Sequence, residues 1–165
     1  MMLDLTRAFA GKQESLDSRL DLSGLELDGV KPFCAPIEIH ADLHGLSGSA
    51  ELTLTVRYTV SKPCDRCGAL TQRAYDRQFT HLVVRELADQ ADDDGDYVVA
   101  EDDRLDLDEL VREDILLDLP TKYLCREDCK GLCPTCGKDL NQGPCGCARQ
   151  EIDPRLAALA GLLED

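Results

Sequence analysis

Cysteines gathered near the end of the chain constrain its fold more than any other feature of the sequence. Six of the nine cysteines lie between Cys125 and Cys147. The last four occur as C-P-T-C-G at positions 133–137 and C-G-C at positions 145–147. A gap of two residues lets two thiolates reach one tetrahedral ion, with zinc–sulfur distances of about 2.3 Å. This pattern predicts a four-thiolate zinc site, the C-terminal site, formed by Cys133, Cys136, Cys145 and Cys147.

A second C-x-x-C-G pattern lies earlier in the chain, at Cys64 and Cys67. The glycine after each second cysteine permits a tight turn, in which backbone N–H groups can point at the first thiolate. Cys125 and Cys129 are left over from the later cluster, and their three-residue gap can present two sulfurs together. We therefore expect one zinc ion in the C-terminal site. As a further hypothesis, a second ion is held in a split site by Cys64, Cys67, Cys125 and Cys129.

Other interpretations of the cysteines stay open on sequence grounds. The later cluster could hold an iron–sulfur cluster, or its thiols could be free or disulfide-bonded. Cys64 and Cys67 could equally be a reduced pair that stabilises a turn. A redox-active C-x-x-C usually opens a helix after a strand, whereas this pair lies between two predicted antiparallel strands. Metal binding is therefore preferred to thiol oxidoreductase activity.

The sequence predicts a cytoplasmic protein. Residues 1–7 lack the uninterrupted apolar run of a signal peptide, and no stretch of eighteen consecutive apolar residues occurs. Thiols in the cytosol are kept reduced, so clustered cysteines there are more often metal ligands than disulfides. We expect no membrane contact and no small-molecule substrate.

Charge is distributed unevenly along the chain. The formal net charge is −15 and the sequence pI is about 4.5, which argues against broad electrostatic adhesion to nucleic acid or anionic lipid. Residues 86–114 hold fourteen of the thirty-three acidic residues against two arginines, a local net charge of −12. Residues 121–149 have a formal net charge of +2. The acidic and basic regions therefore suit different partners.

Alternating polar and apolar residues predict an antiparallel sheet. At 36–44 and again at 52–60, apolar side chains occupy every second position, which is typical of half-buried strands. The short connection at 45–48 predicts a hairpin. Further extended segments are predicted at 72–85 and 16–22. The expected fold class is α+β: an antiparallel sheet or partly closed barrel with one packing helix, and a zinc-knuckle or ribbon-like C-terminal segment followed by a short helix.

Two helices are predicted after the sheet. Asp106 is a suitable N-cap with Glu109 three residues later, and Pro120 ends the helical pattern, so a helix is predicted over 106–119. Proline after Asp153 is typical of a helix start and predicts a short closing helix.

The predicted elements divide the chain near residue 120. We expect a β-rich domain at 1–120 and a cysteine-rich metal-binding segment with the closing helix at 121–165. Residues 88–103 contain little to bury and are predicted to form an acidic loop, with a short strand at 97–99. The acids at 92–94 lack the spacing of a calcium-binding loop, so a solvated loop is the preferred interpretation.

No catalytic machinery is visible in the sequence. It contains no Ser-His-acid pattern, no phosphate-binding glycine loop and no His-Glu metalloprotease spacing. We therefore assign no catalytic residue and predict that the protein is not an enzyme. His40, His44 and His81 are interpreted as solvated side chains, and Cys34 as a small buried apolar residue.

Three segments together resemble a known bacterial family. They are C-D-R-C-G at 64–68, E-D-I-L-L-D-L-P at 113–120 and C-K-G-L-C-P-T-C-G-K-D-L-N at 129–141. The set is similar to the YceD family of large ribosomal RNA subunit accumulation proteins, and the resemblance continues through 145–147 and 153–155 to the leucine-rich end. It implies a non-enzymatic role in 23S ribosomal RNA accumulation and large-subunit assembly.

Two kinds of partner fit this implied role. The acidic stretch could hold a basic ribosomal protein, because opposite charges favour rapid encounter, and we expect this contact to come first. Basic residues around the cysteines could instead meet phosphates of 23S ribosomal RNA. A zinc-ribbon accessory factor of transcription or translation is the alternative function. The residues expected to contact RNA or another partner are Arg66, Lys122, Arg126, Lys130 and Lys138.

Overall fold

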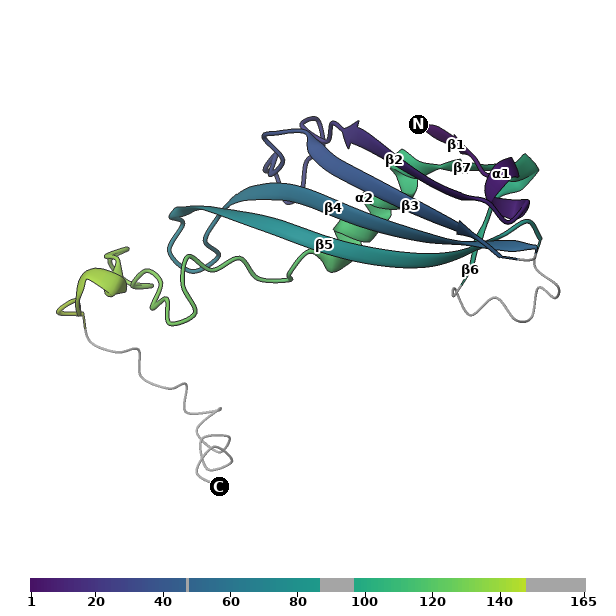
Figure 1. The fold of residues 1–165 in the computed structure, drawn as a ribbon. Coiled ribbons are helices and arrows are strands. Elements are labelled where there is room, and N and C mark those ends of the chain that lie inside the picture. Colours follow the sequence, from purple (N-terminus) through teal and green to yellow (C-terminus); the bar gives the residue numbers. More distant parts are fainter. Residues whose placement is uncertain (47, 87–96, 148–165) are drawn as a thin grey trace, which may run out of the picture.

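A long, curved sheet forms the body of the protein (Figure 1). The computed structural model describes residues 1–46, 48–86 and 97–147. Five strands lie in the spatial order β2-β3-β4-β5-β6, and β4 and β5 are paired along their whole length. The strands are β2 (Gln13–Leu20), β3 (Ile37–Gly45), β4 (Ser49–Pro63), β5 (Leu70–Val84) and β6 (Tyr97–Val99).

The sheet is open and mixed. Strands β2 to β5 pair antiparallel, which confirms the predicted hairpin between β3 and β4. Strand β6 pairs parallel to β5, so the expectation of a purely antiparallel sheet or a partly closed barrel was wrong at this edge. A parallel neighbour needs a connection of a dozen or more residues, and twelve residues separate the end of β5 from the start of β6. The α+β class is confirmed.

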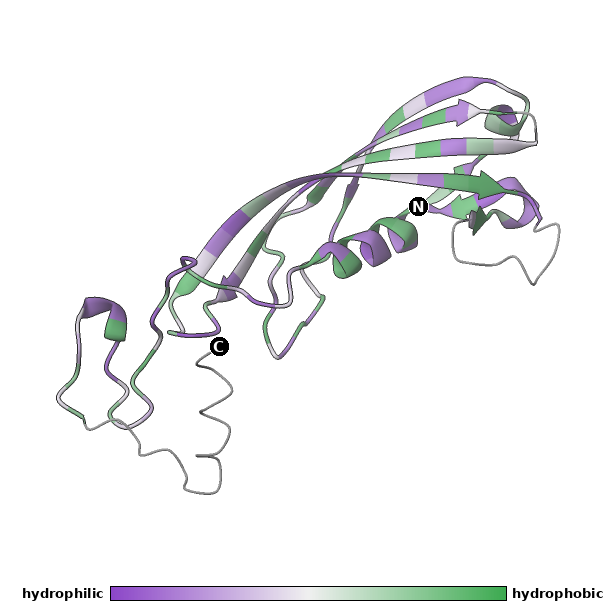
Figure 2. Ribbon diagram, turned by 90° about the horizontal axis from the view of Figure 1, so that it is seen from below, coloured by the Kyte–Doolittle hydropathy of each residue, from purple (hydrophilic) through white to green (hydrophobic). Residues whose placement is uncertain are grey.

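A two-stranded ribbon and the helices complete the fold. Strands β1 and β7 pair antiparallel, and β7 leads directly into α2. Figure 2 shows α2 lying along one side of the curved sheet. No sequence pattern predicted β1, α1 or β7, which are only three or four residues long. These elements are β1 (Met2–Asp4), α1 (Thr6–Phe9), β7 (Arg104–Asp106) and α2 (Leu107–Asp118), with 3-10 helices η2 (Glu101–Asp103) and η3 (Leu140–Gln142).

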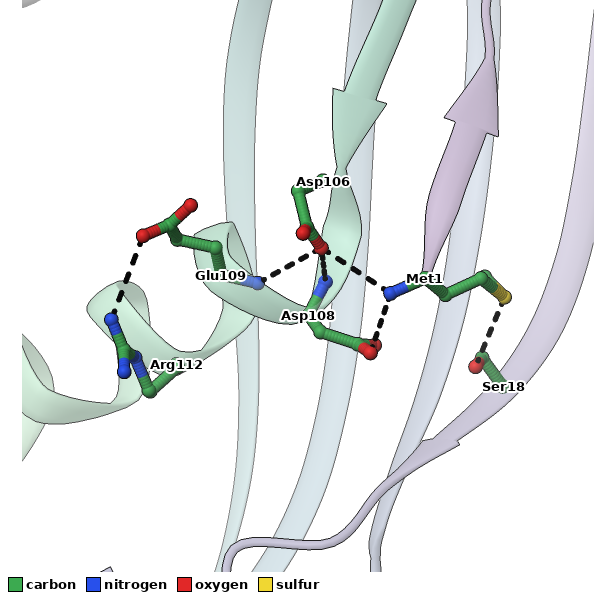
Figure 3. Close-up of polar contacts among 6 residues, drawn as sticks. All are labelled: Met1, Ser18, Asp106, Asp108, Glu109 and Arg112. Carbon is green, nitrogen blue, oxygen red and sulfur yellow. Dashed lines mark hydrogen bonds and ion pairs between the residues drawn. The ribbon is translucent and has the colours of Figure 1, made fainter.

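Helix α2 begins at the predicted cap. The Asp106 carboxylate accepts hydrogen bonds from the backbone N–H groups of Asp108 at 3.1 Å and Glu109 at 3.4 Å (Figure 3). These bonds satisfy donors that have no partner within the helix. The helix ends at Asp118, and the next residue, Leu119, has the extended backbone that is favoured before Pro120.

One face of α2 enters the hydrophobic core. Leu107, Val111 and Ile115 repeat with helical spacing and are fully buried, and Leu117 on the opposite face is 87% exposed. The inward side chains of β3 and β4 fill the other side of this core, because successive side chains of a strand point to opposite faces. The apolar core therefore lies between α2 and the concave sheet.

Polar contacts fix α2 against β4 and β5. His81 Nε2 lies 2.9 Å from an Asp114 carboxylate oxygen, and both side chains are largely buried. Arg77 donates to Asp118 at 2.6 Å, and the Tyr58 hydroxyl donates to the same carboxylate at 3.3 Å. The prediction that His81 is solvated was wrong, because its position in β5 faces α2.

The predictions about the exposure of two histidines and of Cys34 had opposite outcomes. His40 and His44 are exposed, as expected, and the Asp17 carboxylate at 2.7 Å from Nδ1 raises the pKa of His40. The prediction that Cys34 is buried was wrong, because its side chain is exposed. Phe33 pairs with Val60 and fills the core, whereas Cys34, Ala35 and Pro36 after it are all exposed.

The described part of the predicted acidic loop belongs to the folded body. Tyr97–Val99 forms the predicted short strand, and Asp103 accepts two hydrogen bonds from the Arg85 guanidinium. Residues 88–96 of that loop, and the predicted closing helix after residue 153, lie outside the described residues. Across the ranges that the structure describes, no helix has the length and hydrophobicity needed to cross a bilayer.

The packing of α2 gives a first prediction. Replacing Ile115 by alanine leaves a cavity in the core and should lower the free energy of unfolding by about 2–5 kcal/mol. Leu117→Ala on the same helix removes an exposed side chain and should change it by less than about 0.5 kcal/mol. Urea unfolding followed by circular dichroism measures both, and equal losses in the two variants would contradict the packing described here.

Candidate metal centres

The first C-x-x-C pattern forms the tip of the β4–β5 hairpin. The Cys64 N–H donates to the Ala69 carbonyl at 2.8 Å, which extends the strand pairing by one step. The Gly68 N–H then donates to the Cys64 carbonyl at 2.8 Å and closes a tight turn. Gly68 has φ +72°, a conformation that glycine adopts without strain. The turn thus places Cys64 and Cys67 on the same side of the tip.

The second C-x-x-C pattern repeats this turn. The Cys133 N–H donates to the Lys138 carbonyl at 2.8 Å, and the Gly137 N–H donates to the Cys133 carbonyl at 2.9 Å. Gly137 has φ +71°, close to the value at Gly68. The same sequence pattern therefore folds into the same knuckle at both places, as the shared glycine predicted.

The nine cysteines are free, and eight of them gather into two groups. Within each group all four sulfur atoms lie within 4.8 Å of one another. One group contains Cys133, Cys136, Cys145 and Cys147, the ligands predicted for the C-terminal site. The other contains Cys64, Cys67, Cys125 and Cys129, the ligands predicted for the split site.

Distances between sulfur atoms fit single tetrahedral ions. In the split site the Sγ atoms of Cys64 and Cys129 are 3.8 Å apart, and those of Cys67 and Cys125 are 3.7 Å apart. Four sulfurs placed about 2.3 Å from one zinc ion are separated by about 3.8 Å. A disulfide would require about 2.05 Å. An iron–sulfur cluster distributes its thiolates over several irons, so this close spacing favours one ion.

The surroundings of the sulfurs favour thiolates. Burial raises the pKa of Cys64, but backbone N–H donors from Cys125, Arg66 and Cys67 outweigh it and lower the pKa to about 6. Backbone N–H groups of Cys136 and Thr135 likewise lower the pKa of Cys133 to about 6. These donors supply the stabilisation that thiolate ligands receive in metal sites.

Crowding of the sulfurs opposes complete ionisation of either group. The adjacent Cys129 sulfur raises the pKa of Cys125 to about 12. In the C-terminal site the Cys136 sulfur has the same effect on Cys147, whose pKa is also raised to about 12. Four thiolates this close repel one another, and a divalent cation at their centre removes that cost. The donor set therefore fits zinc in both places.

The chain after α2 returns to the hairpin tip to complete the split site. Asp65 and Tyr123 form a reciprocal pair: Asp65 N–H donates to the Tyr123 carbonyl at 2.8 Å, and Tyr123 N–H donates to the Asp65 carboxylate at 2.6 Å. The Lys62 ammonium lies 4.7 Å from the centre of the Tyr123 ring. This docking brings Cys125 and Cys129 to the tip.

Sequence reasoning missed two side chains that support the split site. Asp65 docks the returning chain, and the Asn141 side-chain amide donates to the Cys129 sulfur at 3.4 Å. Both residues lie inside the segments that resemble the family, but their hydrogen-bond partners are far away in sequence or lie on the neighbouring knuckle. Spacing between cysteines carries no signal for such contacts.

The five predicted RNA-contacting cations are exposed, but three are engaged within the chain. Arg66 donates to the Cys129 carbonyl at 2.7 Å, Lys138 donates to the Pro144 carbonyl at 3.0 Å, and Arg126 pairs with Asp128 at 3.4 Å. Lys122 and Lys130 have no side-chain hydrogen bond or ion pair among the described residues. The cysteine-rich end therefore presents a modest positive surface.

A shallow groove lies at the other end of the sheet. It has a volume of about 500 Å³ and is lined by β6, β7 and α2, with Val98, Val99 and Leu110 among its apolar side chains. One arginine, Arg104, also lines it. The acidic residues along it are Glu101, Asp102, Asp106, Glu109 and Glu113.

Comparison with known proteins places the chain in a family. The family model for "Large ribosomal RNA subunit accumulation protein YceD" matches residues 52–163, which include both cysteine groups. The chain belongs to the YceD family. The resemblance found in the three sequence segments is thereby confirmed.

Relatives in this family come from bacteria and plants. Protein YlbN of Bacillus subtilis is 29% identical over 131 residues, covering 79% of this chain and 76% of its own. An uncharacterized protein of Mycobacterium tuberculosis (strain H37Rv) is 29% identical over 142 residues, covering 85% of this chain and 68% of its own. "Large ribosomal RNA subunit accumulation protein YCED homolog 1, chloroplastic" of Arabidopsis thaliana is 24% identical, covering 81% and 50%. No solved structure matches the chain.

The two groups give a prediction about metal content. Protein purified from zinc-supplemented cells should contain about two zinc ions per chain, since each group offers four sulfurs to one ion. Cys64→Ser/Cys67→Ser and Cys145→Ser/Cys147→Ser should each contain about one ion, because each change removes half of one ligand set. Plasma mass spectrometry measures the content, and Cys34→Ser is the control that should keep both ions. Rapid alkylation of all eight clustered thiols in the zinc-loaded protein would contradict the assignment.

Proposed function

We propose that this YceD-family protein is a non-enzymatic, cytoplasmic factor that supports accumulation of 23S ribosomal RNA and assembly of the large ribosomal subunit. The observation that carries the proposal is the family match over residues 52–163. The Arabidopsis relative, and a further relative from Zea mays that is 27% identical, are both named as large ribosomal RNA subunit accumulation proteins. The clustered cysteines support a binding role, since their thiols lie in tight knuckles that would have a structural function.

Zinc at both cysteine groups is part of this proposal. The sulfurs of Cys64, Cys67, Cys125 and Cys129, and those of Cys133, Cys136, Cys145 and Cys147, would hold the two ions. Bound zinc would cross-link the segment after α2 to the hairpin tip and give it a fixed shape. The role proposed for the cysteines is therefore structural, and they offer a rigid surface to a partner.

A basic ribosomal protein is the first partner that we propose. The groove beside α2 combines apolar side chains with five acidic residues, which complements a segment rich in lysine and arginine that also carries an apolar side chain. The exposed Lys122 and Lys130 at the opposite end are the cations best placed for a later contact with ribosomal RNA. The two ends of one molecule would then meet protein and RNA together.

Deletion of the gene tests the proposed function. In the deletion strain 23S ribosomal RNA should fall relative to 16S, and sucrose gradients should show fewer large subunits. Restoring the wild-type gene should reverse both effects, and the wild-type protein should sediment with large-subunit precursors. An unchanged ribosomal RNA ratio and gradient profile in the deletion strain would overturn the proposal.

Pull-down at low and moderate salt tests the order of contacts. A basic large-subunit protein should be recovered from cells even after nuclease digestion, and recovery should fall as salt rises. Glu109→Gln/Glu113→Gln should weaken recovery, because it removes two charges from the groove. Glu38→Gln/Glu51→Gln is the matched control, since it removes two exposed charges from the strand face turned away from α2. Recovery that depends wholly on intact RNA would favour the RNA contact instead.

A further inference from the structure

Hydrogen bonds connect the two cysteine groups directly. The Arg66 carbonyl, inside the first knuckle, accepts from the Leu132 N–H at 3.1 Å, and Leu132 immediately precedes Cys133 of the second knuckle. The Arg66 guanidinium donates to the Cys129 carbonyl at 2.7 Å. Each bond joins residues more than sixty positions apart in the sequence. The knuckles are therefore parts of one hydrogen-bonded unit.

Gly131 makes this close approach possible. Its φ is +72°, and a Cβ atom built on it would lie 2.9 Å from the Arg66 carbonyl oxygen. Real Cβ atoms essentially never approach so closely, so a side chain here would push the two knuckles apart. The Gly131 carbonyl also accepts from the Leu140 N–H at 2.9 Å. One glycine thus contacts both the hairpin tip and the loop of the C-terminal site.

Asn141 reaches from the loop of the C-terminal site to a ligand of the split site. It lies in η3, between Cys136 and Cys145, and its side-chain N–H donates to the Cys129 sulfur at 3.4 Å. Its side-chain oxygen accepts from the Lys130 N–H at 2.8 Å. The same amide N–H group lies 2.7 Å from the Asp139 carboxylate, which fixes the orientation of the side chain.

The position of Asn141 depends on the loop that closes the C-terminal site. Residues between Cys136 and Cys145 run from one ligand pair to the other, so an ion bound there fixes both ends of the loop that carries η3. An N–H donor aimed at a thiolate strengthens the metal site to which that thiolate belongs. An ion in the C-terminal site therefore fixes the position of Asn141, and Asn141 in turn stabilises the Cys129 thiolate of the split site.

We propose that the two zinc sites bind metal cooperatively, and that Asn141 is the positioning residue through which the C-terminal site raises the zinc affinity of the split site. The inference rests on the proposed zinc sites and adds a coupling between them. By thermodynamic linkage the coupling is reciprocal, so an ion in the split site raises the affinity of the C-terminal site by the same factor.

Zinc competition with a chromophoric chelator, performed on the full chain, tests the coupling. In the Cys145→Ser/Cys147→Ser variant only the split site keeps all four ligands. The zinc affinity of the split site should be about 5–150-fold lower there than in the wild type. Cys64→Ser/Cys67→Ser should lower the affinity of the C-terminal site by a similar factor. Circular dichroism verifies that the sheet is retained in both variants.

Asn141→Ala tests the hydrogen bond between the two sites without removing any metal ligand. It should lower the affinity of the split site by about 10–100-fold, which is the usual effect of removing a hydrogen-bond partner of a metal ligand. In the Cys64→Ser/Cys67→Ser background the same change should leave the C-terminal site unaffected. Gln142→Ala is the matched control, since Gln142 is the next residue of η3 and also donates to Asp139. It should leave both affinities unchanged.

Cadmium-113 spectra give a readout that does not depend on affinity. The cadmium-loaded wild type should give two resonances, and Asn141→Ala should shift the one that is lost in Cys64→Ser/Cys67→Ser, because a thiolate ligand loses its N–H donor. Two ions bound with independent affinities, or equal behaviour of Asn141→Ala and Gln142→Ala, would overturn the coupling while the zinc sites stand. A wild-type content of fewer than two ions would overturn the zinc sites together with the coupling.

Discussion

Pairing between β4 and β5 is the constraint on which the rest of the structure depends. The fifteen residues of each strand pair in one continuous register, from Ser49 opposite Val84 to Pro63 opposite Leu70. At one end of this ladder β5 pairs with β6, which lines the groove beside α2, and at the other end lies the first cysteine knuckle. A strand of this length spans roughly 45 Å. The two candidate binding regions are thus held at opposite ends of one rigid element (Figure 1).

Much of this fold could be predicted because its signals are periodic. Alternation at 36–44 and 52–60 indicated the β3–β4 hairpin, and Asp106 with the later Pro120 indicated the bounds of α2. The features that were missed depend on tertiary contacts. The parallel pairing of β6 with β5 is a contact between segments separated in sequence, and the short strands β1 and β7 are held mainly by each other. A strand of three residues is too short to show an alternating pattern, so the sequence carries no signal for these contacts.

The metal ligands could be predicted from the sequence, but the contacts that support them could not, for a related reason. Identical C-x-x-C-G spacing indicated both knuckles, and counting the remaining cysteines indicated the partners of Cys64 and Cys67. Spacing could not indicate that His81 faces Asp114 or that Asn141 contacts Cys129, since each pair joins different elements. The exposure of Cys34 was misjudged because its apolar neighbours suggested burial, whereas residues 34–36 lie on the surface between the buried Phe33 and Ile37.

The two ends of the molecule obtain their order from different sources. Around α2, a continuous set of aliphatic side chains from β3, β4 and the helix is removed from water, and burial of each contributes about 1.5–3 kcal/mol. Between residues 121 and 147 the only described apolar or sulfur side chains that are buried are Tyr123, Cys129 and Cys133. A structural zinc ion contributes about 10–16 kcal/mol, which exceeds what three such side chains can supply. The cysteine-rich end is therefore the part of the protein whose shape would follow zinc supply, whereas the sheet and its acidic groove would persist without it.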